Sequence, residues 1–137
     1  MNKTMKELGL KADNETRSKV VTAFRKLRSK GFIARANYLC CQTCAGHAIG
    51  EELDKQIALG KKMNGYVFWH RQDEDSYWRT GVLFLAYGGA GETSTEKAGR
   101  TVVETLEACG LKVEWNGDIG QRIRVIVQDE EEEEELK

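Results

Sequence analysis

Proline is missing from this 137-residue sequence, histidine occurs twice, and no apolar run approaches the length of a membrane helix. The first residues, MNKTMKEL, also lack the apolar segment of a secretion signal. We therefore expect a cytoplasmic protein without a membrane partner. Thiols stay reduced in the cytoplasm, so the four cysteines are not expected to form structural disulfides. Cysteines that cluster in such a protein more often bind a metal or take part in chemistry.

Net charge is also nearly absent, at −1, but the charges are unevenly distributed. Residues 1–39 contain ten Lys or Arg and three acids, whereas residues 129–137 contain seven acids and one lysine. Such a run of like charge repels itself and is typical of an interaction tail. We interpret it either as a solvated solubility tail, or as a mimic of nucleic-acid phosphates or a flap over the basic N-terminal region. The acids expected to bind a partner are Asp129, Glu130, Glu131 and Glu132.

The length predicts one domain over residues 1–127, followed by the acidic tail over residues 128–137. Apolar periodicity predicts three helices, over about residues 14–30, 44–59 and 94–109. Their expected N-terminal caps are Asn14, Thr43 and a capping box of Thr93 with Glu96, and a glycine follows each helix.

The remaining segments predict strands. Residues 32–39 are expected to form an extended connector, and "YVFWH" and "VLFLAY" to form two strands joined by the polar turn "RQDEDSYWRTG". "LKVEW" and "QRIRVIV" predict a second hairpin, because their apolar residues alternate. The predicted order is α-α-β-β-α-β-β, an α+β domain with about three helices and an antiparallel sheet of about four strands.

Three of the four cysteines lie in the stretch "YLCCQTCAGHAI". Cys41 and Cys44 are spaced like the two thiolates with which a zinc knuckle holds its ion. A structural zinc site needs four ligands, so two more are required. The candidates are Cys40, His47, His70 and Cys109, of which Cys109 continues an apolar helix stripe and is expected to be a small core residue.

The same cysteine pair also fits other chemistry. A helix N-terminus lowers the pKa of a thiol, which favours a redox site. Against this, the pair follows a helix and a connector rather than a strand of a βαβ unit, and no proline is present to form the cis-proline of a thioredoxin-like site. A nucleophile, Cys40 or Cys41, with His70 as its base is a further alternative, and inert buried thiols are the last.

Surface features indicate a protein partner rather than nucleic acid. An exposed Trp69 or Trp78 would make a good docking anchor. The positive side chains of the first helix are scattered and have no aromatic platform beside them, so direct nucleic-acid binding is not expected. "HRQDED" groups a histidine with three carboxylates, but consecutive acids in a turn usually diverge into water.

The segments "LRSKGFIARANYLCCQTC", "GYVFWHRQD", "GVLFLAYG" and "VVETLEACGLKVEWNG" resemble a bacterial family of uncharacterised domains. Members pair a Cys-Cys-x-x-Cys motif with a Gly-Tyr-x-Phe-x-His-x-Gln-Asp stretch, and the resemblance covers about residues 25–127. It implies no activity. It directs attention to Cys40, Cys41, Cys44, His70, Gln72 and Asp73. Joining the three cysteines to His70 implies a zinc shell and favours His70 over His47 as the fourth ligand.

These features predict a non-enzymatic protein-interaction module whose fold is stabilised by zinc on Cys40, Cys41, Cys44 and His70. The expected partner is a nucleic-acid-handling protein complex. Small size and an acidic tail also fit a phage-type inhibitor of such a complex, anti-CRISPR proteins among them. The alternative from another class is a cysteine- or zinc-dependent enzyme, or a thiol redox protein, that uses Cys41, Cys44 and His70.

Overall fold

The computed structural model describes residues 12–127, which form four helices and five strands. Their order is α2 (Asn14–Ser29), β1 (Phe32–Arg35), α3 (Gln42–Ala58), β2 (Gly65–Phe68), α4 (Arg71–Thr80), β3 (Val82–Gly89), α5 (Thr95–Ala108), β4 (Lys112–Glu114) and β5 (Ile123–Ile126). None of these helices is both long and apolar enough to span a membrane.

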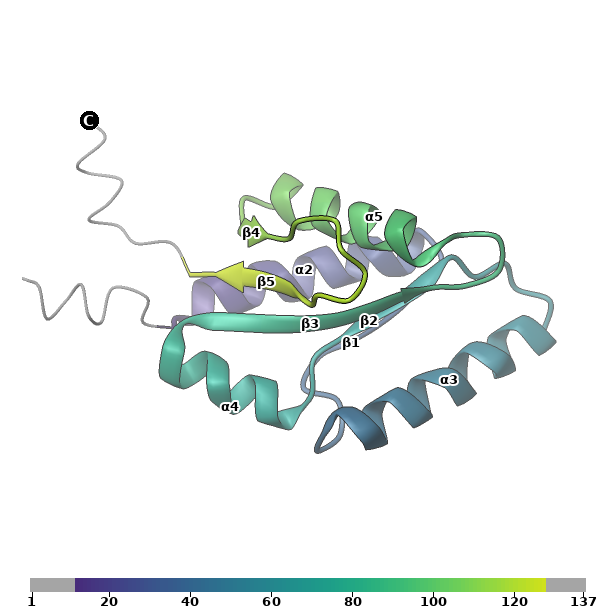
Figure 1. Ribbon diagram of the computed structural model, residues 1–137, viewed down its shortest axis with the longest axis horizontal. Coiled ribbons are helices and arrows are strands. Elements are labelled where there is room, and N and C mark those ends of the chain that lie inside the picture. Colours follow the sequence, from purple (N-terminus) through teal and green to yellow (C-terminus); the bar gives the residue numbers. More distant parts are fainter. Residues whose placement is uncertain (1–11, 128–137) are drawn as a thin grey trace, which may run out of the picture.

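The strands form one sheet in the order β1-β2-β3-β5-β4. β1 and β2 are parallel, and every other neighbouring pair is antiparallel. Figure 1 shows α2 and α5 on one side of the sheet and α3 and α4 on the other. The predicted α+β class is therefore confirmed, and the sheet is mostly antiparallel rather than wholly so, because β1 and β2 are parallel. Residues 12–127 contain one strand and one helix more than the sequence indicates.

α2 forms for the reason its sequence suggests. Val20, Phe24 and Leu27 recur at helical spacing and are at most 1% exposed. The cap is Asp13 rather than the expected Asn14, because the Asp13 carboxylate accepts the backbone N–H of Thr16 at 2.7 Å.

The extended connector expected over residues 32–39 is instead partly a strand. β1 pairs in parallel with β2 from Phe32, opposite Gly65, to Arg35, opposite Phe68. Two parallel strands need a crossover, and α3 provides it, so β1, α3 and β2 form a βαβ unit. The pairing partner lies thirty residues away in sequence, and a four-residue strand carries no alternation strong enough to reveal it.

The polar turn expected before β3 is the helix α4. His70 is its N-cap: the imidazole Nδ1 accepts the backbone N–H of Asp73, and the Asp73 carboxylate accepts the backbone N–H of His70. Gly81 ends the helix in the left-handed conformation, at φ 79°. The usual capping box has Ser or Thr at the N-cap and Glu or Gln three residues later. This one has His and Asp at those positions, so the sequence pattern does not predict it.

The other predicted elements need smaller corrections. Cys41, not Thr43, is the N-cap of α3, and Ser94, whose hydroxyl accepts the backbone N–H of Lys97, replaces Thr93 as the cap of α5. On α3, Ile57 follows Ile49 and Leu53 at intervals of four residues, yet its side chain is 48% exposed. The hairpin of β4 and β5 is confirmed, with Val113 opposite Val125.

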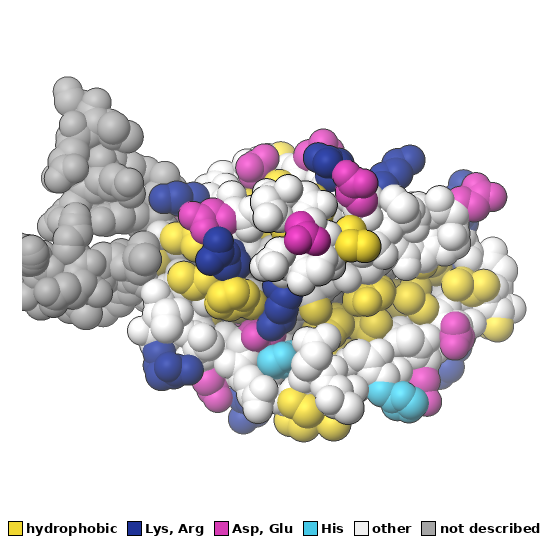
Figure 2. Space-filling view, viewed as in Figure 1, with side chains coloured by type: hydrophobic (Ala, Val, Ile, Leu, Met, Phe, Trp, Pro, Cys, Tyr) yellow, Lys and Arg dark blue, Asp and Glu magenta, His cyan; other side chains and the backbone are white. Residues whose placement is uncertain are grey.

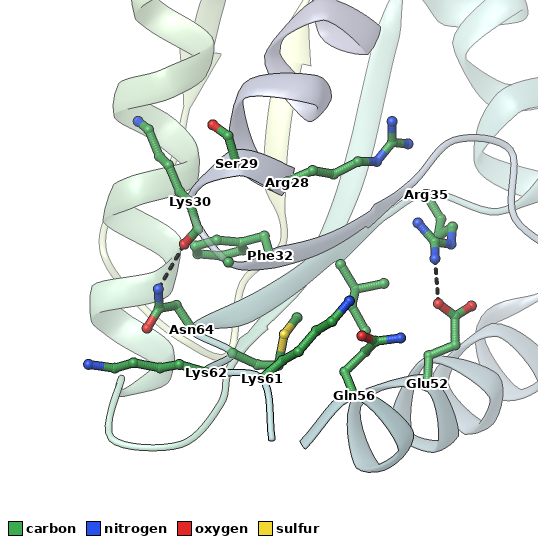
Figure 3. A pocket seen from close by; sticks show the side chains of 13 residues that line it. Arg28, Ser29, Lys30, Phe32, Arg35, Glu52, Gln56, Lys61, Lys62 and Asn64 are labelled. Carbon is green, nitrogen blue, oxygen red and sulfur yellow. Dashed lines mark hydrogen bonds and ion pairs between the residues drawn. The ribbon is translucent and has the colours of Figure 1, made fainter. Parts of the chain in front are cut away.

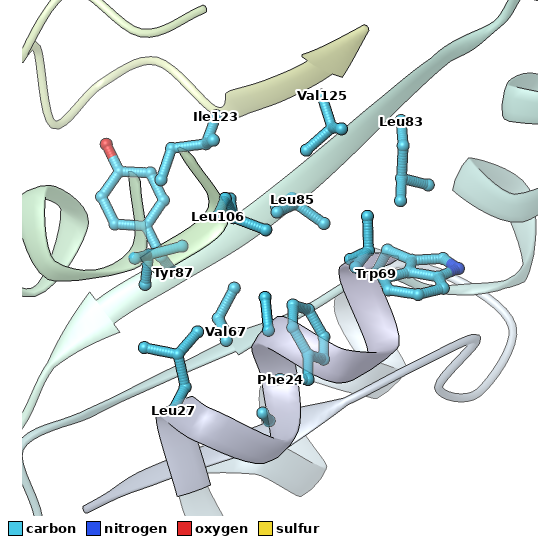
Figure 4. Packing of buried hydrophobic residues seen from close by; sticks show 14 of the residues in the cluster. Phe24, Leu27, Val67, Trp69, Leu83, Leu85, Tyr87, Leu106, Ile123 and Val125 are labelled. Atoms are coloured by element: carbon cyan, nitrogen blue, oxygen red, sulfur yellow. The ribbon is translucent and has the colours of Figure 1, made fainter. Parts of the chain in front are cut away.

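Two clusters of buried side chains hold the sheet. The larger lies between the sheet, α2 and α5, and Figure 4 shows its packing around Phe24, Leu85 and Leu106. The smaller lies under α3 and includes Ile33, Ala45, Ile49, Phe68 and Ala86. Because side chains alternate along a strand, adjacent residues such as Leu85 and Ala86 serve different clusters.

Trp69 belongs to the larger cluster and is fully buried. The prediction that it docks a partner is therefore wrong. Its indole Nε1–H donates to the Glu74 carboxylate at 2.8 Å, and the guanidinium of Arg17 binds the same carboxylate. Trp78 is 42% exposed, so its predicted docking role stays a prediction.

One buried ion pair fixes the start of α4 against the sheet. The Asp73 carboxylate accepts from both terminal nitrogens of Arg122, at 3.1 and 2.7 Å, and the Asp73 side chain is only 9% exposed. A bidentate contact of this kind adds geometric specificity as well as energy.

We therefore expect Asp73→Asn to lower the free energy of unfolding by about 2–4 kcal/mol, because it removes the charge that Arg122 faces in a buried site. Asp75→Asn is the matched control, since Asp75 is exposed on the same helix and should change stability by less than about 0.5 kcal/mol. Urea unfolding of both variants measures the difference. Equal midpoints for the two would show that the ion pair does not anchor α4.

Candidate metal centre

Three thiols meet at the surface. The Sγ atoms of Cys40, Cys41 and Cys44 all lie within 4.8 Å of one another, and those of Cys40 and Cys41 are 3.8 Å apart. Cys40 and Cys44 are exposed and Cys41 is half-buried, and all three are free thiols. Their exposure rules out inert buried thiols, and their grouping can hold a metal ion.

A strained turn makes the adjacent Cys40 and Cys41 face one point. Asn37 and Leu39 adopt positive φ angles of 50° and 62°, which only glycine adopts without cost. Such conformations cost about 1–3 kcal/mol each and persist where surrounding contacts enforce them. The sharp turn that two neighbouring ligands require is therefore present immediately before them.

A polar network from α3 holds this turn. The Tyr38 hydroxyl donates to the Glu52 carboxylate at 2.7 Å, and Arg35, at the end of β1, binds the other oxygen of that carboxylate. Burial, followed by the bond to Glu52, raises the pKa of Tyr38 to about 12. The residue pattern offers no signal for this network, because Glu52 looks like any acid on a helix surface.

The turn also continues the pairing of the two parallel strands. The backbone N–H of Trp69 donates to Arg35, that of Tyr38 donates to Trp69, and that of Arg71 donates to Leu39 at 2.9 Å. The cysteines thus follow the carboxyl end of β1, beside the carboxyl end of β2. In open α/β sheets, ligands bind outside the carboxyl ends of strands.

The start of α3 gives the thiols different acidities. The backbone N–H of Cys44, followed by the neighbouring thiols, lowers the pKa of the Cys41 thiol. The thiols of Cys40 and then Cys41 hold the Cys44 thiol in its protonated form and raise its pKa to about 11. An N-cap cysteine of lowered pKa is suited both to metal ligation and to nucleophilic attack, because each needs a thiolate.

His70 does not join the cysteine cluster. Its backbone is next to the turn, but the side chain is 5% exposed and both ring nitrogens lie against Asp73, with Nε2 3.2 Å from its carboxylate. Burial, more than any nearby charge, lowers the pKa of this imidazole. The expectation that His70 is the fourth zinc ligand is thus not met, because capping α4 uses the imidazole that the ligand role requires. The same geometry leaves Cys40 and Cys41 without His70 as a base.

The remaining candidate ligands lie outside the cluster as well. His47 is exposed on α3, with Nε2 3.3 Å from the carboxylate of Glu51, which agrees with its place as a helix-face residue. Cys109 caps the C-terminal end of α5 and packs, half-buried, against the larger cluster. The tail residues Asp129, Glu130, Glu131 and Glu132 lie outside the described residues.

The hydroxyl of Tyr38 offers a direct test of how the turn is held. Tyr38→Phe should speed hydrogen exchange at the Arg71 amide by about fivefold and lower stability by about 1 kcal/mol, because the turn loses its bond to Glu52. The matched control is Tyr66→Phe, since Tyr66 is a half-buried tyrosine of the same face whose hydroxyl has no hydrogen-bond partner among the described residues. Unchanged exchange at Arg71 in the Tyr38 variant would remove Glu52 as the anchor.

Comparison with known proteins identifies a family for the chain but no individual relative. No match was found among curated proteins or among solved structures. Residues 11–129 match the family described as "Domain of unknown function (DUF6891)". The match covers the whole described fold but says nothing specific about the cysteine motif. The chain therefore belongs to the DUF6891 family of domains of unknown function.

Proposed function

We propose that the protein is a metal-binding interaction module in which Cys40, Cys41 and Cys44 hold one zinc ion at the start of α3. The observation that carries the proposal is the convergence of three surface thiols, all within 4.8 Å of one another. Thiolates are soft ligands that select zinc and similar ions over magnesium or calcium. A tetrahedral ion with metal–sulfur bonds of about 2.3 Å needs sulfurs about 3.8 Å apart, and the Cys40–Cys41 separation is 3.8 Å.

The proposed site differs from a structural zinc site, which has four protein ligands, because only three are assigned here. Within residues 12–127, no imidazole or carboxylate belongs to the thiol cluster. A zinc site with three protein ligands keeps one position for water or an incoming group. An acid or base beside the ion would favour catalysis, and His70, the N-cap of α4, faces Asp73 instead.

An interaction role fits the surroundings of the thiols better. Leu39, immediately before the cysteines in sequence, is 47% exposed, so a partner at the thiols has an apolar side chain to bury nearby. A partner that buries Leu39 can supply the fourth ligand from its own side chain. Figure 2 shows acidic and basic side chains mixed on one face of the molecule, around a band of apolar ones. The nucleic-acid inhibitor role depends on the acidic tail, so the proposal retains only the interaction role.

Metal content tests the proposal. Purified protein should contain about one zinc per chain by elemental analysis, and Cys41→Ser should lose it, because a hydroxyl is a poor substitute for a thiolate. Cys109→Ser is the matched control and should keep the metal, since Cys109 lies outside the cluster. Metal-free wild type from a zinc-supplemented preparation would contradict the proposal.

Chelation distinguishes a zinc ion bound to an already stable fold from a four-ligand structural zinc on which folding depends. The described fold has its own buried core, so removing zinc should lower the melting temperature by only about 10 °C, the effect of an ion present at about 100 times its Kd. His47→Ala and His70→Asn should both retain the metal. Loss of zinc from either histidine variant, with the fold intact by circular dichroism, would place the fourth ligand within this chain.

A thiol redox protein is the second candidate, and one observation favours it. The sequence argues against this role because no βαβ unit is expected, yet β1, α3 and β2 form one and the Cys41–Cys44 pair starts its helix. In this role, the Cys41 thiolate attacks a substrate disulfide and Cys44 resolves the mixed disulfide. Two electrons and two protons pass to the substrate, which leaves as two thiols, while Cys41 and Cys44 become a disulfide.

Titration against glutathione distinguishes the two candidates. A redox protein should form the Cys41–Cys44 disulfide reversibly, with a midpoint inside the glutathione range, and should reduce insulin disulfides in the absence of zinc. Cys40→Ser should retain that activity, because the reaction uses only the other two thiols. A metal module should resist oxidation when zinc is bound and show no reductase activity, so either result excludes the other role.

A further inference from the structure

A second candidate site is a pocket at the far end of α3 from the cysteines. It has a volume of about 590 Å³ and is lined by the C-terminal end of α2, β1, the second half of α3 and the loop before β2. Figure 3 shows that Arg28, Arg35, Glu52, Gln56 and Lys61 lie on the same side of this pocket. None of the cysteines lines it, so it is separate from the candidate metal centre.

Hydrogen bonds of Asn64 hold one wall of the pocket together. The Asn64 side chain donates to the carbonyl of Lys30 at 2.7 Å and accepts from the Thr93 hydroxyl at 3.2 Å, while its backbone N–H donates to Gly31. These bonds tie the loop before β2 to the end of α2. The cavity is therefore preformed, as small-molecule sites usually are.

The positive charges of the pocket are incompletely neutralised. Arg28 donates through two nitrogens to the carbonyl of Ala34, at 3.1 and 2.8 Å, and a carbonyl carries no net charge. Arg35 is paired with Glu52. Lys61 is exposed, and its ammonium has no hydrogen-bond or ion-pair partner within the described part of the chain. Lys30 and Lys62 also line the pocket, but Figure 3 shows their side chains extending toward its other side. Without these two lysines, Arg28 and Lys61 leave a surplus of two positive charges.

Helix ends reduce this surplus without cancelling it. α2 and α3 both end near the pocket, and each helix C-terminus carries about −0.5 charge. About one net positive charge remains on a concave, partly enclosed surface, where low-dielectric walls strengthen its field. If these basic residues only neutralised the two helix C-termini, no net positive charge would remain, so the remaining charge is available to a ligand.

Figure 3 distinguishes two neighbouring lysines. Lys61 reaches inward between Gln56 and Phe32, whereas Lys62 and Lys30 extend toward the opposite side. The Lys30 ammonium donates to the Thr105 hydroxyl on α5, at 2.8 Å. Three positive side chains of the lining therefore remain on the side of the pocket away from Lys30 and Lys62, namely Lys61, Arg28 and Arg35, and the Gln56 amide lies beside Lys61.

We propose that this pocket binds a small molecule that carries a phosphate group, held by Lys61, Arg28 and Arg35. A phosphate ester carries about −1.5 to −2 charge at pH 7 and several acceptor oxygens. It therefore matches one ammonium and two guanidinium groups better than a ligand with a single carboxylate, which carries only one negative charge. The cavity has room for more than the phosphate, because sites of about 300–1,000 Å³ hold drug-sized ligands.

The experiment titrates the full-length protein, labelled with ¹⁵N, with inorganic pyrophosphate at low salt. Amides of Ile33, Lys61 and Asn64 should shift and saturate with a Kd of about 1 mM or below. Lys61→Gln should weaken binding by about tenfold, because a charge-assisted hydrogen bond is lost. Lys61→Arg should restore it. Lys62→Gln, which removes the same charge one residue away, should weaken binding less than about twofold.

Four outcomes would overturn the proposal. The first is the absence of saturable shifts at about 10 mM pyrophosphate, and the second is equal weakening by Lys61→Gln and Lys62→Gln, which indicates diffuse charge attraction. The third is tighter binding of a single strand of about 12 nucleotides, with shifts along α2 outside the pocket, which assigns the surface to a nucleic-acid backbone. The fourth is a set of shifts confined to Thr43 and Cys44, which would report withdrawal of zinc by pyrophosphate and would overturn the pocket while supporting the proposed metal centre.

Discussion

The parallel pairing of β1 with β2 is the constraint on which the rest of the site depends. It aligns Phe32–Arg35 with Gly65–Phe68 and continues beyond both strands through the backbone bonds of Tyr38 and Arg71. Two strands that run in the same direction require a crossover, and here the crossover is α3. The cysteine turn is therefore fixed between a strand end and a helix start, where backbone N–H groups point outward and favour thiolates.

The residues that follow the carboxyl end of β2 stabilise the fold and do not form an acid/base site. The segment "HRQDED" has the composition of an acid/base site, yet His70 and Asp73 cap α4 and each other, and Arg122 neutralises the pair. Glu74 accepts from the indoles of Trp69 and Trp78, and its pKa is lowered by bonds to Arg17 and these indoles that outweigh the effect of burial. Buried polar groups need partners, and these groups find theirs within the fold.

α3 links the two surfaces to which we assign binding roles. Its start carries the thiols and its second half lines the basic pocket. The Glu52 carboxylate lies between them, because it binds Tyr38 of the cysteine turn and Arg35 of the pocket wall. One helix surface residue thus contributes to the geometry of both sites. Such a residue is invisible to motif analysis, since nothing in its sequence neighbourhood distinguishes it from a solvated acid.

The sequence by itself determined the apolar stripe of α2, the hairpin of β4 and β5, the α+β class and the grouping of Cys40, Cys41 and Cys44, because these depend on neighbours within a few residues. Only the tertiary structure decided that residues 32–35 are a strand, that Trp69 is buried and that His70 faces Asp73. Each of these depends on contacts between distant segments, which local periodicity does not encode. The three thiols were therefore identified from their spacing, whereas the separation of His70 from them and the basic pocket follow only from the assembled sheet.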